Sequence, residues 1–304
     1  LGLAMGCWAL GRWLSQERAP WRFGPWFILA PMAGLVALSA IGLPFALDPM
    51  YTAGRIAHLL LMVAFYLLLV NARLSPAAIA RSMATGMALQ AAVGIPQFFV
   101  GGSLGLPFLG ERALDPHVPG LSVIVVGQER LLRAYGLAQH PNMLGAFLSA
   151  FLLATLGFFL DRLRWRTAPI LVAMGAGLLT LLLTFSRSAW LGLALGGLAL
   201  GIIYVLDCRR RRCSARPLLF LAATALVVGV SFALLEWRML QPRLGVAESG
   251  VETRSVDERV SLARAAWALI RLRPLLGVGL GNFPVGVVRL VPETVADYPS
   301  HQPV

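Results

Sequence analysis

The chain has 304 residues, of which 58% are hydrophobic and only 13% are charged. Soluble globular domains carry about 25% charged residues, so this composition excludes an ordinary soluble protein and indicates a membrane protein. The net charge of +12 comes from 26 basic residues, all arginine, which fall in short runs between apolar stretches. That placement is typical of membrane-topology signals and argues against a nucleic-acid-binding protein.

Apolar windows of about 20 residues predict helices that cross a bilayer. The predicted spans are a partial one at 1–14 and complete ones at 25–47, 55–70, 82–101, 142–160, 168–185, 188–206 and 217–236. The predicted fold class is therefore all-α, a polytopic transmembrane helical bundle. Because the sequence starts inside an apolar window and stops at Val304, we expect further segments beyond both ends.

The connections between the predicted spans alternate in charge. The basic ones are residues 15–24, 71–81, 161–167 and 207–216. Short arginine-rich connections stay on the cytoplasmic side, so residues 102–141 and the last segment, 237–304, face outward. We expect that last segment to be a large, partly helical periplasmic loop. We divide the chain into N-terminal transmembrane helices, 1–129, and a core, 130–304, within one integrated membrane domain.

One arginine, Arg187, interrupts the otherwise uncharged stretch 168–206. That stretch is too long for one span and has the length of two, so we predict an outer turn at "SRS" (186–188). The turn puts Arg187 at the boundary between membrane and water. An arginine there either extends toward lipid head groups or holds a phosphate group of a substrate.

A second outward motif, "RLLRAYGLAQHPNMLGAFL" (130–148), places polar residues just before a predicted span. Arg133, His140 and Asn142 belong to it, and Pro141 suits the first position of a helix. Two interpretations stay open. The histidine and asparagine either brace the start of the helix or contact a ligand.

The third motif, "SVDERVSLARAAWALIRLRP" (255–274), predicts an outer helix that begins at a capping box of Ser255 and Glu258 and ends before Pro274. Spacing of three and four residues gives this helix two arginine-bearing faces. One face holds Arg259, Ala263, Ala266, Trp267 and Ile270, and the other holds Arg264, Ala268 and Arg271. Such a helix either lies on the membrane surface or contributes arginines to a site.

The fourth motif, "PLLGVGLGNFP" (274–284), contains Gly277, Gly279 and Gly281. These glycines imitate a dinucleotide fingerprint, but no strand precedes them and no helix clearly follows. We therefore predict a tight glycine turn beside a substrate or another backbone segment.

Several kinds of chemistry are missing from the sequence. No Asp or Glu lies in the interior of a predicted span, and Glu236 sits at the edge of one, although ion-coupled transport relies on intramembrane carboxylates. Neither Gly-x-Ser-x-Gly nor His-Glu-x-x-His is present. Cys208 and Cys213 flank an arginine run in a basic connection, where a reducing compartment favours free thiols over a disulfide. The outer segments instead contain arginines, whose guanidinium groups suit phosphates and diphosphates.

Three stretches, "RAYGLAQHPNMLGAFL", "TFSRSAWLGLALG" and "ERVSLARAAWALIRLRPLLGVGLGNF", occur in this order, followed by an outer loop with a histidine near its end. Together they resemble the O-antigen ligase and polymerase-like family of bacterial membrane glycosyltransferases. The resemblance covers residues 130 to 304. Residues 1–129 are described by their hydropathy alone.

The resemblance implies transfer of a glycan from undecaprenyl diphosphate to an acceptor hydroxyl on the periplasmic face of the bacterial inner membrane. The acceptor is a lipid A core sugar in ligases and another glycan repeat in polymerases. The family is expected to work without a metal or other cofactor, amid membrane lipids and without a nucleic-acid partner. Protein glycosylation is a further alternative within this class, and a polysaccharide or lipid-carrier transporter is the alternative outside it.

The family motifs imply roles for particular residues. Arg187 matches the Ser-Arg motif and Arg259 the arginine ahead of the outer-loop tryptophan, so both are expected to be catalytic and to stabilise the diphosphate leaving group. The expected substrate-binding residues are Arg133, His140, Asn142, Trp267, Gly277, Gly279 and Asn282. Relatives carry a His-Asn pair that supplies the general base. Here His301 is followed by Gln302, so either His301 is the base or the base lies beyond Val304.

Overall fold

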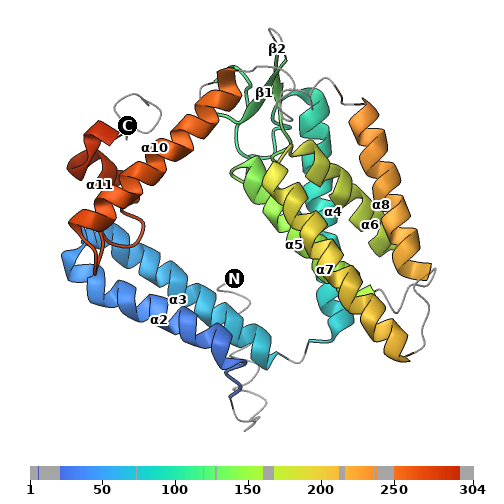
Figure 1. Ribbon diagram of the computed structural model, residues 1–304, viewed down its shortest axis with the longest axis horizontal. Coiled ribbons are helices and arrows are strands. Elements are labelled where there is room, and N and C mark those ends of the chain that lie inside the picture. The colour runs from blue at the N-terminus through green and yellow to red at the C-terminus, as the bar shows by residue number, and fades with distance from the viewer. Residues whose placement is uncertain are drawn as a thin grey trace. The chain divides into compact units, whose positions relative to one another are not determined.

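The computed structural model of the chain is helical, with a single short β-hairpin among the residues that it describes (Figure 1). It describes residues 21–72, 74–118, 120–126, 129–159, 168–211, 216–235 and 250–294, together with Gly6 and Trp237. The prediction of an all-α, polytopic fold is confirmed. Within the described residues, five helices are long and apolar enough to cross a membrane. The predicted partial span at 1–14 lies outside them, Gly6 excepted.

The complete spans predicted from hydropathy all correspond to helices. These are α2 (Trp26–Gly42), α3 (Pro49–Asn71), α4 (Pro76–Val100), α5 (Pro141–Phe159), α6 (Ala168–Leu183), α7 (Arg187–Arg211) and α8 (Arg216–Leu235). Helix starts follow local chemistry. Asp48 accepts a hydrogen bond from the Tyr51 N–H ahead of α3, and Ser75 accepts one from the Ala78 N–H ahead of α4. A proline follows each of these capping residues, as helix N-termini favour.

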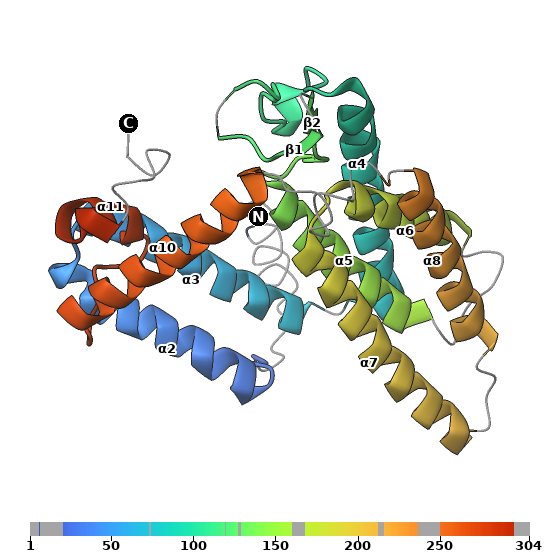
Figure 2. The ribbon, with the colours of Figure 1, turned by 45° about the horizontal axis from the view of Figure 1, so that its top comes forward.

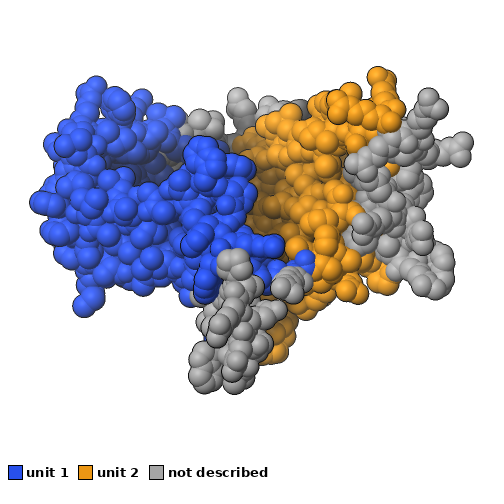
Figure 3. Space-filling model, turned by 90° about the horizontal axis from the view of Figure 1, so that it is seen from below, with its two compact units in different colours: residues 1–74, 253–304 blue, residues 75–252 orange. Residues whose placement is uncertain are grey.

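The chain divides into two compact units, drawn in separate colours in Figure 3. Unit 1 comprises residues 1–74 and 253–304, and unit 2 comprises residues 75–252. The N-terminal helices α2 and α3 thus group with the C-terminal outer segment. The predicted boundary at residue 129 is based on the motifs. It stays a prediction about function, because the compact units have their boundaries at other residues.

Unit 1 contains α2, α3, most of α10 (Gly250–Leu272), α11 (Phe283–Leu290) and the short 3-10 helices η1 (Leu43–Phe45) and η4 (Pro292–Thr294). Its outer part has a small core in which Ala265 and Leu269 of α10 pack with Val287 of α11 and with Val291. Gly286 of α11 allows this close approach, because a Cβ there would lie 3.2 Å from Leu269 Cδ1.

Unit 2 is built around α4, α5, α6 and α7, which share one hydrophobic core that includes Met87, Leu144, Leu148 and Leu181. Helices α5 and α7 run side by side in the same direction (Figure 1). Gly145 meets Ala189 near their starts, and Gly157 meets Leu200 further along. Parallel alignment puts the N-termini of α5 and α7 at one end of the unit.

The connection between α4 and α5 carries a β-hairpin that hydropathy does not predict. Strand β1 (Val123–Val126) pairs antiparallel with β2 (Glu129–Leu132), and Val123 lies opposite Leu132. The hairpin packs with Leu114 and Tyr135 in a small second core. Figure 2 shows it beyond the end of α4. The long outer connection is therefore folded, and it leads directly into the polar motif ahead of α5.

Three local predictions are wrong. Helix α10 begins at Gly250, so Ser255 lies inside it and is not its capping residue, because helical structure extends upstream of the capping-box pattern. The turn between α6 and α7 comprises residues 184–186, two residues earlier than the predicted 186–188, and Arg187 is the first residue of α7. Cys208 is disulfide-bonded, whereas the expected redox state of its compartment had predicted a free thiol.

Candidate functional site

The turn between α6 and α7 is held in an uncommon backbone conformation. Phe185 has φ of 47°, the one positive φ of a non-glycine residue in the described chain. Bulky residues avoid this region, at a cost of roughly 1–3 kcal/mol. Phe185 is nevertheless buried in an aromatic cluster that fixes it. Its ring centroid lies 6.1 Å from Phe98, 6.1 Å from Trp190 and 5.4 Å from Phe232.

Arg187 follows this turn directly, and its side chain is exposed. The position is electrostatically adverse, because a helix N-terminus carries a partial positive charge that disfavours a cation by about 0.3–1 kcal/mol. A guanidinium and the N–H groups of the first helical turn together favour a bound anion. The arrangement at Arg187 is therefore one that an anionic group would stabilise.

The first turn of α5 adds to this environment. A Cβ on Gly145 would lie 2.8 Å from Ala189 Cβ and 3.2 Å from Ser186 Cβ, so the starts of α5 and α7 are in direct contact. Ser149 Oγ strengthens the contact by donating to the Ala189 carbonyl at 3.1 Å. Two parallel helix dipoles thus point their positive ends at the same region.

Arg133 is buried behind these helix starts, with 3% of its surface exposed. Its Nε donates to the Thr184 carbonyl at 2.6 Å, its Nη1 donates to Ser122 Oγ, and its Nη2 donates to Asn142 Oδ1 at 2.8 Å. Arg133 therefore joins three segments: the residue ahead of β1, the turn that precedes Arg187, and the first turn of α5. The structure brings Arg133 and Asn142 of the second motif together in this way, and their contact with substrate stays a prediction.

His140 caps α5. Its backbone carbonyl accepts from Leu144 N, and its Nδ1 accepts from the Asn142 N–H at 3.1 Å. Because Nδ1 is an acceptor, the neutral ring carries its proton on Nε2. Burial, together with the positive charges of Arg133 and Arg112, lowers the pKa of His140. At neutral pH this histidine is an uncharged group with one N–H to donate.

Sequence reasoning missed two glutamines of α4 and one glutamate that brace this motif. Gln90 Oε1 accepts from Leu137 N at 2.9 Å, and Gln97 Nε2 donates to the Gly136 carbonyl at 3.1 Å. Gln97 Nε2 also donates to the buried Glu111 Oε1 at 2.7 Å. Burial raises the pKa of Glu111, but hydrogen bonds from Gln97 and from backbone N–H groups outweigh it and lower the pKa overall. Two glutamines at a seven-residue spacing in an apolar span are the signal that could have revealed this bracing.

The other predicted catalytic arginine, Arg259, belongs to unit 1. It lies on α10 with its side chain exposed. On the same helix, Trp267 is 57% exposed, and the guanidinium carbon of Arg271 lies 5.5 Å from the centre of its ring. The buried face of α10 is a third one, centred on Ala265 and Leu269, and Ala268 of the second predicted face packs against it. The arginines of both predicted faces stay exposed.

The glycine motif forms a tight turn against another backbone segment. Gly277, Gly279 and Gly281 all have positive φ, between 62° and 98°. A Cβ on Gly279 would lie 2.5 Å from Ala46 Cβ and 2.8 Å from Thr52 Oγ1, at the connection between α2 and α3. The sequence had left open whether the turn lies beside a substrate or a backbone. The structure packs Gly279 against the side chains of Ala46 and Thr52, beside a backbone hydrogen bond from Leu47 N to the Val278 carbonyl. A substrate role for Gly277 and Gly279 stays a prediction.

Asn282 is fully buried beside this turn. Its Nδ2 donates to Thr52 Oγ1 at 3.0 Å, to the Val278 carbonyl at 3.0 Å and to the Asp48 carbonyl at 3.3 Å. Its Oδ1 has no hydrogen-bond partner within the described part of the chain. The contacts make Asn282 a link between the glycine turn and the start of α3, and its predicted contact with substrate stays a prediction.

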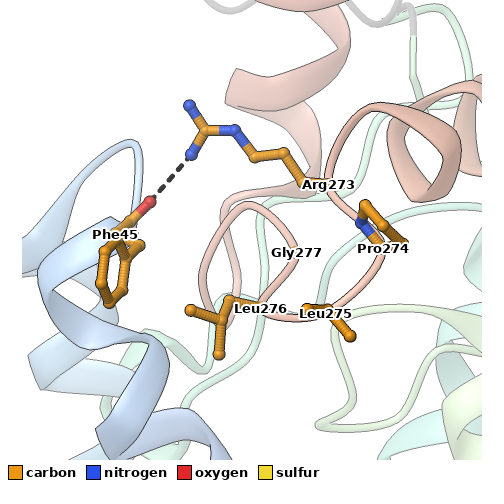
Figure 4. A pocket seen from close by; sticks show the side chains of 6 residues that line it. All are labelled: Phe45, Arg273, Pro274, Leu275, Leu276 and Gly277. Carbon is orange, nitrogen blue, oxygen red and sulfur yellow. Dashed lines mark hydrogen bonds between the residues drawn. The ribbon is translucent and has the colours of Figure 1, made fainter.

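An open cavity of about 430 Å³ lies next to the glycine turn (Figure 4). It is lined by Phe45, Arg273, Pro274, Leu275, Leu276 and Gly277. Arg273 Nη1 donates to the Phe45 carbonyl at 2.8 Å, which Figure 4 marks as a dashed line. The lining is therefore apolar, with one guanidinium attached to the end of a predicted span.

No metal centre is visible in the described residues, which contain no group of three or more His, Cys, Asp or Glu able to hold an ion. The base candidate His301 lies outside the described residues. The fold and these residues define a multi-pass membrane protein that carries arginine and two helix N-termini at one end of unit 2.

Comparison with known proteins adds a match to a family model over part of the chain. Residues 172–302 match the family model described as O-Antigen ligase, which confirms the resemblance over this segment. The matched segment contains both Arg187 and Arg259. It supports a membrane glycosyltransferase of the ligase or polymerase type in general. Comparisons with curated proteins and with solved structures gave no match.

Proposed function

We propose that the protein is an O-antigen-ligase-like glycosyltransferase that moves a glycan from undecaprenyl diphosphate to an acceptor hydroxyl. The lipid A core is the proposed acceptor, and the reaction takes place on the periplasmic face of the bacterial inner membrane. The observation that best supports this proposal is the cationic end of unit 2. There, Arg187 begins α7, and the first turn of α7 contacts the first turn of the parallel helix α5. In the proposed reaction, Arg187 and these helix N-termini hold the diphosphate.

The chemistry needs a fixed positive charge at the leaving group. The acceptor oxygen attacks the anomeric carbon, the bond from that carbon to the diphosphate oxygen breaks, and its electron pair stays on the diphosphate. The acceptor proton passes to a general base, for which His301 is the available candidate in the sequence. Arg187 stabilises the charge that develops on the diphosphate, as donors do in an oxyanion hole.

Arg133, His140 and Asn142 support the site in different ways. Arg133 donates hydrogen bonds to the Thr184 carbonyl, in the turn, and to Asn142 Oδ1, in α5. It therefore positions Arg187 and adds a fixed charge behind it. Neutral His140 offers its Nε2–H to a sugar hydroxyl or phosphate oxygen. The catalytic role of Arg259, and the glycan contact of Trp267, rest on their family motif and are separate parts of the proposal.

A glycan polymerase and a protein-glycosylating ligase use the same donor chemistry and differ in acceptor. A polysaccharide or lipid-carrier transporter would also need outward arginines, but it would not break the bond to the diphosphate. A test of the function must therefore detect bond cleavage and transfer, rather than binding.

The experiment is complementation of a deletion strain by the full-length protein and its Arg187→Ala and Arg259→Ala variants. We expect both variants to insert in the membrane and to lose glycan transfer, while lipid-linked glycan accumulates on the periplasmic side. Transfer at the normal rate by either variant would refute the catalytic role of that arginine. Accumulation of lipid-linked glycan on the cytoplasmic side of the deletion strain would replace transfer with transport.

The matched control is Arg210→Ala. Arg210 is an exposed arginine at the opposite end of the same helix, α7. Its loss changes the net charge as much as the loss of Arg187 does, but leaves the first turn of α7 intact. We expect Arg210→Ala to transfer glycan normally, which separates a site effect from a general effect of charge.

A further inference from the structure

Helix α10 has a second apolar face, which no described residue covers. Val260, Ala263, Trp267 and Ile270 form a stripe along it, and all four side chains are exposed. This stripe, called here the outer stripe, lies on the side opposite Ala265 and Leu269, which pack with α11. An apolar helix face left open in this way needs an apolar environment.

Arginines border the outer stripe on both sides. At 100° per residue, Arg259 falls beside Ile270 on one edge, and Arg264 and Arg271 fall beside Val260 on the other. All three arginine side chains are exposed. An apolar stripe between two rows of arginine is the pattern of a helix that lies in a membrane interface, with guanidinium groups reaching up to phosphates.

The C-terminal end of α10 is attached to the end of a membrane span in the same unit. Phe45 ends the apolar span Trp26–Phe45, and its carbonyl accepts from Arg273 Nη1 at 2.8 Å. One step further along, Leu47 N donates to the Val278 carbonyl at 3.0 Å. Leu275, between these two contacts, is 86% exposed. The end of α10 is thus fixed at the level where the chain leaves the bilayer.

The direction of α10 agrees with an interfacial position. Figures 1 and 2 show α10 leaving the end of the α2–α3 pair at a steep angle to those helices. In Figure 1, α11 and the length of the α2–α3 pair lie on opposite sides of α10. The face opposite α11, which carries the outer stripe, is therefore turned toward the side on which α2 and α3 enter the membrane.

We propose that α10 is a membrane-docking helix, whose outer stripe enters the phospholipid headgroup region and whose Arg264 and Arg271 bind phospholipid phosphates. Arg271 also lies over the Trp267 ring, which orients a guanidinium at the water side of an interfacial tryptophan. The occupant is the bilayer that α2 and α3 cross. Docking would hold the outer segment at the membrane surface, where a lipid-linked donor resides.

The test uses nitroxide labels on the full-length protein in liposomes, in a background whose three cysteines are replaced by serine. Ala263→Cys reports on the outer stripe. Met62→Cys, exposed near the middle of α3, is the lipid reference, and Glu129→Cys, exposed on the hairpin, is the water reference. Power saturation then compares accessibility to oxygen, which concentrates in lipid, with accessibility to a water-soluble nickel chelate.

We expect the ratio of oxygen to nickel accessibility at residue 263 to lie between the ratios at residues 62 and 129, because a helix in the interface is buried less deeply than the middle of a span. Nickel accessibility equal to that of residue 129 would overturn the proposal, because the stripe would face water. Low accessibility to both reagents would also overturn it, because another protein surface would then cover the stripe. Glycan transfer is not the readout, so the result does not depend on the proposed function.

A second measurement tests the phosphate contacts. The label at residue 263 is followed in liposomes of phosphatidylcholine alone and in an equal mixture with anionic phosphatidylglycerol. Each arginine near an anionic surface favours docking about fivefold, so nickel accessibility should fall in the mixture. Arg264→Gln should weaken docking to the mixture about fivefold, so the fall in nickel accessibility should be smaller, and the matched variant Arg289→Gln, on α11, should keep it. Equal responses of the two variants would overturn the role of Arg264.

Discussion

Arginines in the two units have opposite surroundings. In unit 2, Arg133 is buried and its hydrogen bonds go to three segments, while Arg187 begins a helix beside a strained and tightly packed turn. In unit 1, the arginines of α10 lie on exposed helix faces beside apolar side chains. A rigid, pre-organised cation suits the stabilisation of one transition state. Exposed and adaptable cations suit a surface made of many phosphates.

The largest effect should come from changing the exposed cation of unit 2. We expect Arg187→Ala to lower the rate of glycan transfer by about 100- to 1,000-fold, the usual loss when one pre-organised donor to a developing negative charge is removed. Arg187→Lys should recover only part of the rate, since a lysine keeps the charge and loses the planar fork. Initial rates with lipid-linked donor in proteoliposomes measure both. A lysine variant with the full rate would show that charge alone suffices.

The next effect concerns the buried cation. Arg133→Gln leaves the Thr184 carbonyl and Asn142 Oδ1 without their donor, so we expect a loss of about 3 kcal/mol in unfolding free energy. Denaturation in detergent measures that loss. Glycan transfer should fall as well, because the turn before Arg187 loses its anchor. An unchanged stability would mean that Arg133 acts on substrate directly, which would remove the contrast between the two arginines of unit 2.

Much of the fold could be predicted from hydropathy. Every complete span predicted from an apolar window is a helix in the structure, because the need to bury backbone polar groups in a bilayer leaves few alternatives. Helix ends were less predictable. Helix α10 begins at Gly250 although Ser255 and Glu258 match a capping box, since three or four residues of local pattern do not decide where a long helix starts.

The candidate site was predictable in part. Motif spacing placed Arg133, His140 and Asn142 next to a helix start, and the structure connects them. Gln97 and Glu111 escaped notice, because their pairing depends on how the outer connection folds back on α4. The packing of Gly279 on Ala46 joins segments more than 200 residues apart, and nothing in either segment alone indicates its partner.

In unit 1, substitutions in the glycine turn should have a smaller effect on stability, and two neighbouring glycines can be compared with each other. Gly279→Ala combines a left-handed conformation with a clash against Ala46, and we expect it to lose about 3 kcal/mol of stability. Gly277→Ala has the strain of its positive φ but no atom within 4 Å of the new Cβ. It should lose about 1 kcal/mol. Denaturation of both variants measures the difference. Equal losses would show that the packing on the α2–α3 connection is loose.

If Gly277→Ala instead keeps its stability and loses glycan transfer, the turn contacts substrate as its motif predicted. That result would give unit 1 a pre-organised element and weaken its contrast with unit 2. Normal transfer by a stable Gly277→Ala would leave the turn with a structural role.

The smallest effect is a pH dependence in unit 2. The pKa of His140 is lowered by burial and by the charges of Arg133 and Arg112, so the unfolded chain binds this proton more readily than the folded one. The stability that neutral His140 confers is present above its unfolded pKa, near 6.5, and is lost as pH falls through the lower, folded value. His140→Asn keeps an acceptor for the Asn142 N–H and cannot titrate. The variant should therefore remove the decrease in unfolding free energy that occurs below about pH 6.5, which amounts to about 1.4 kcal/mol per unit of pKa shift. His140→Ala should remove the same decrease and lose about 1 kcal/mol more at pH 7, because the cap is gone. A slope that survives in His140→Asn would place the titrating group elsewhere and leave His140 with capping alone.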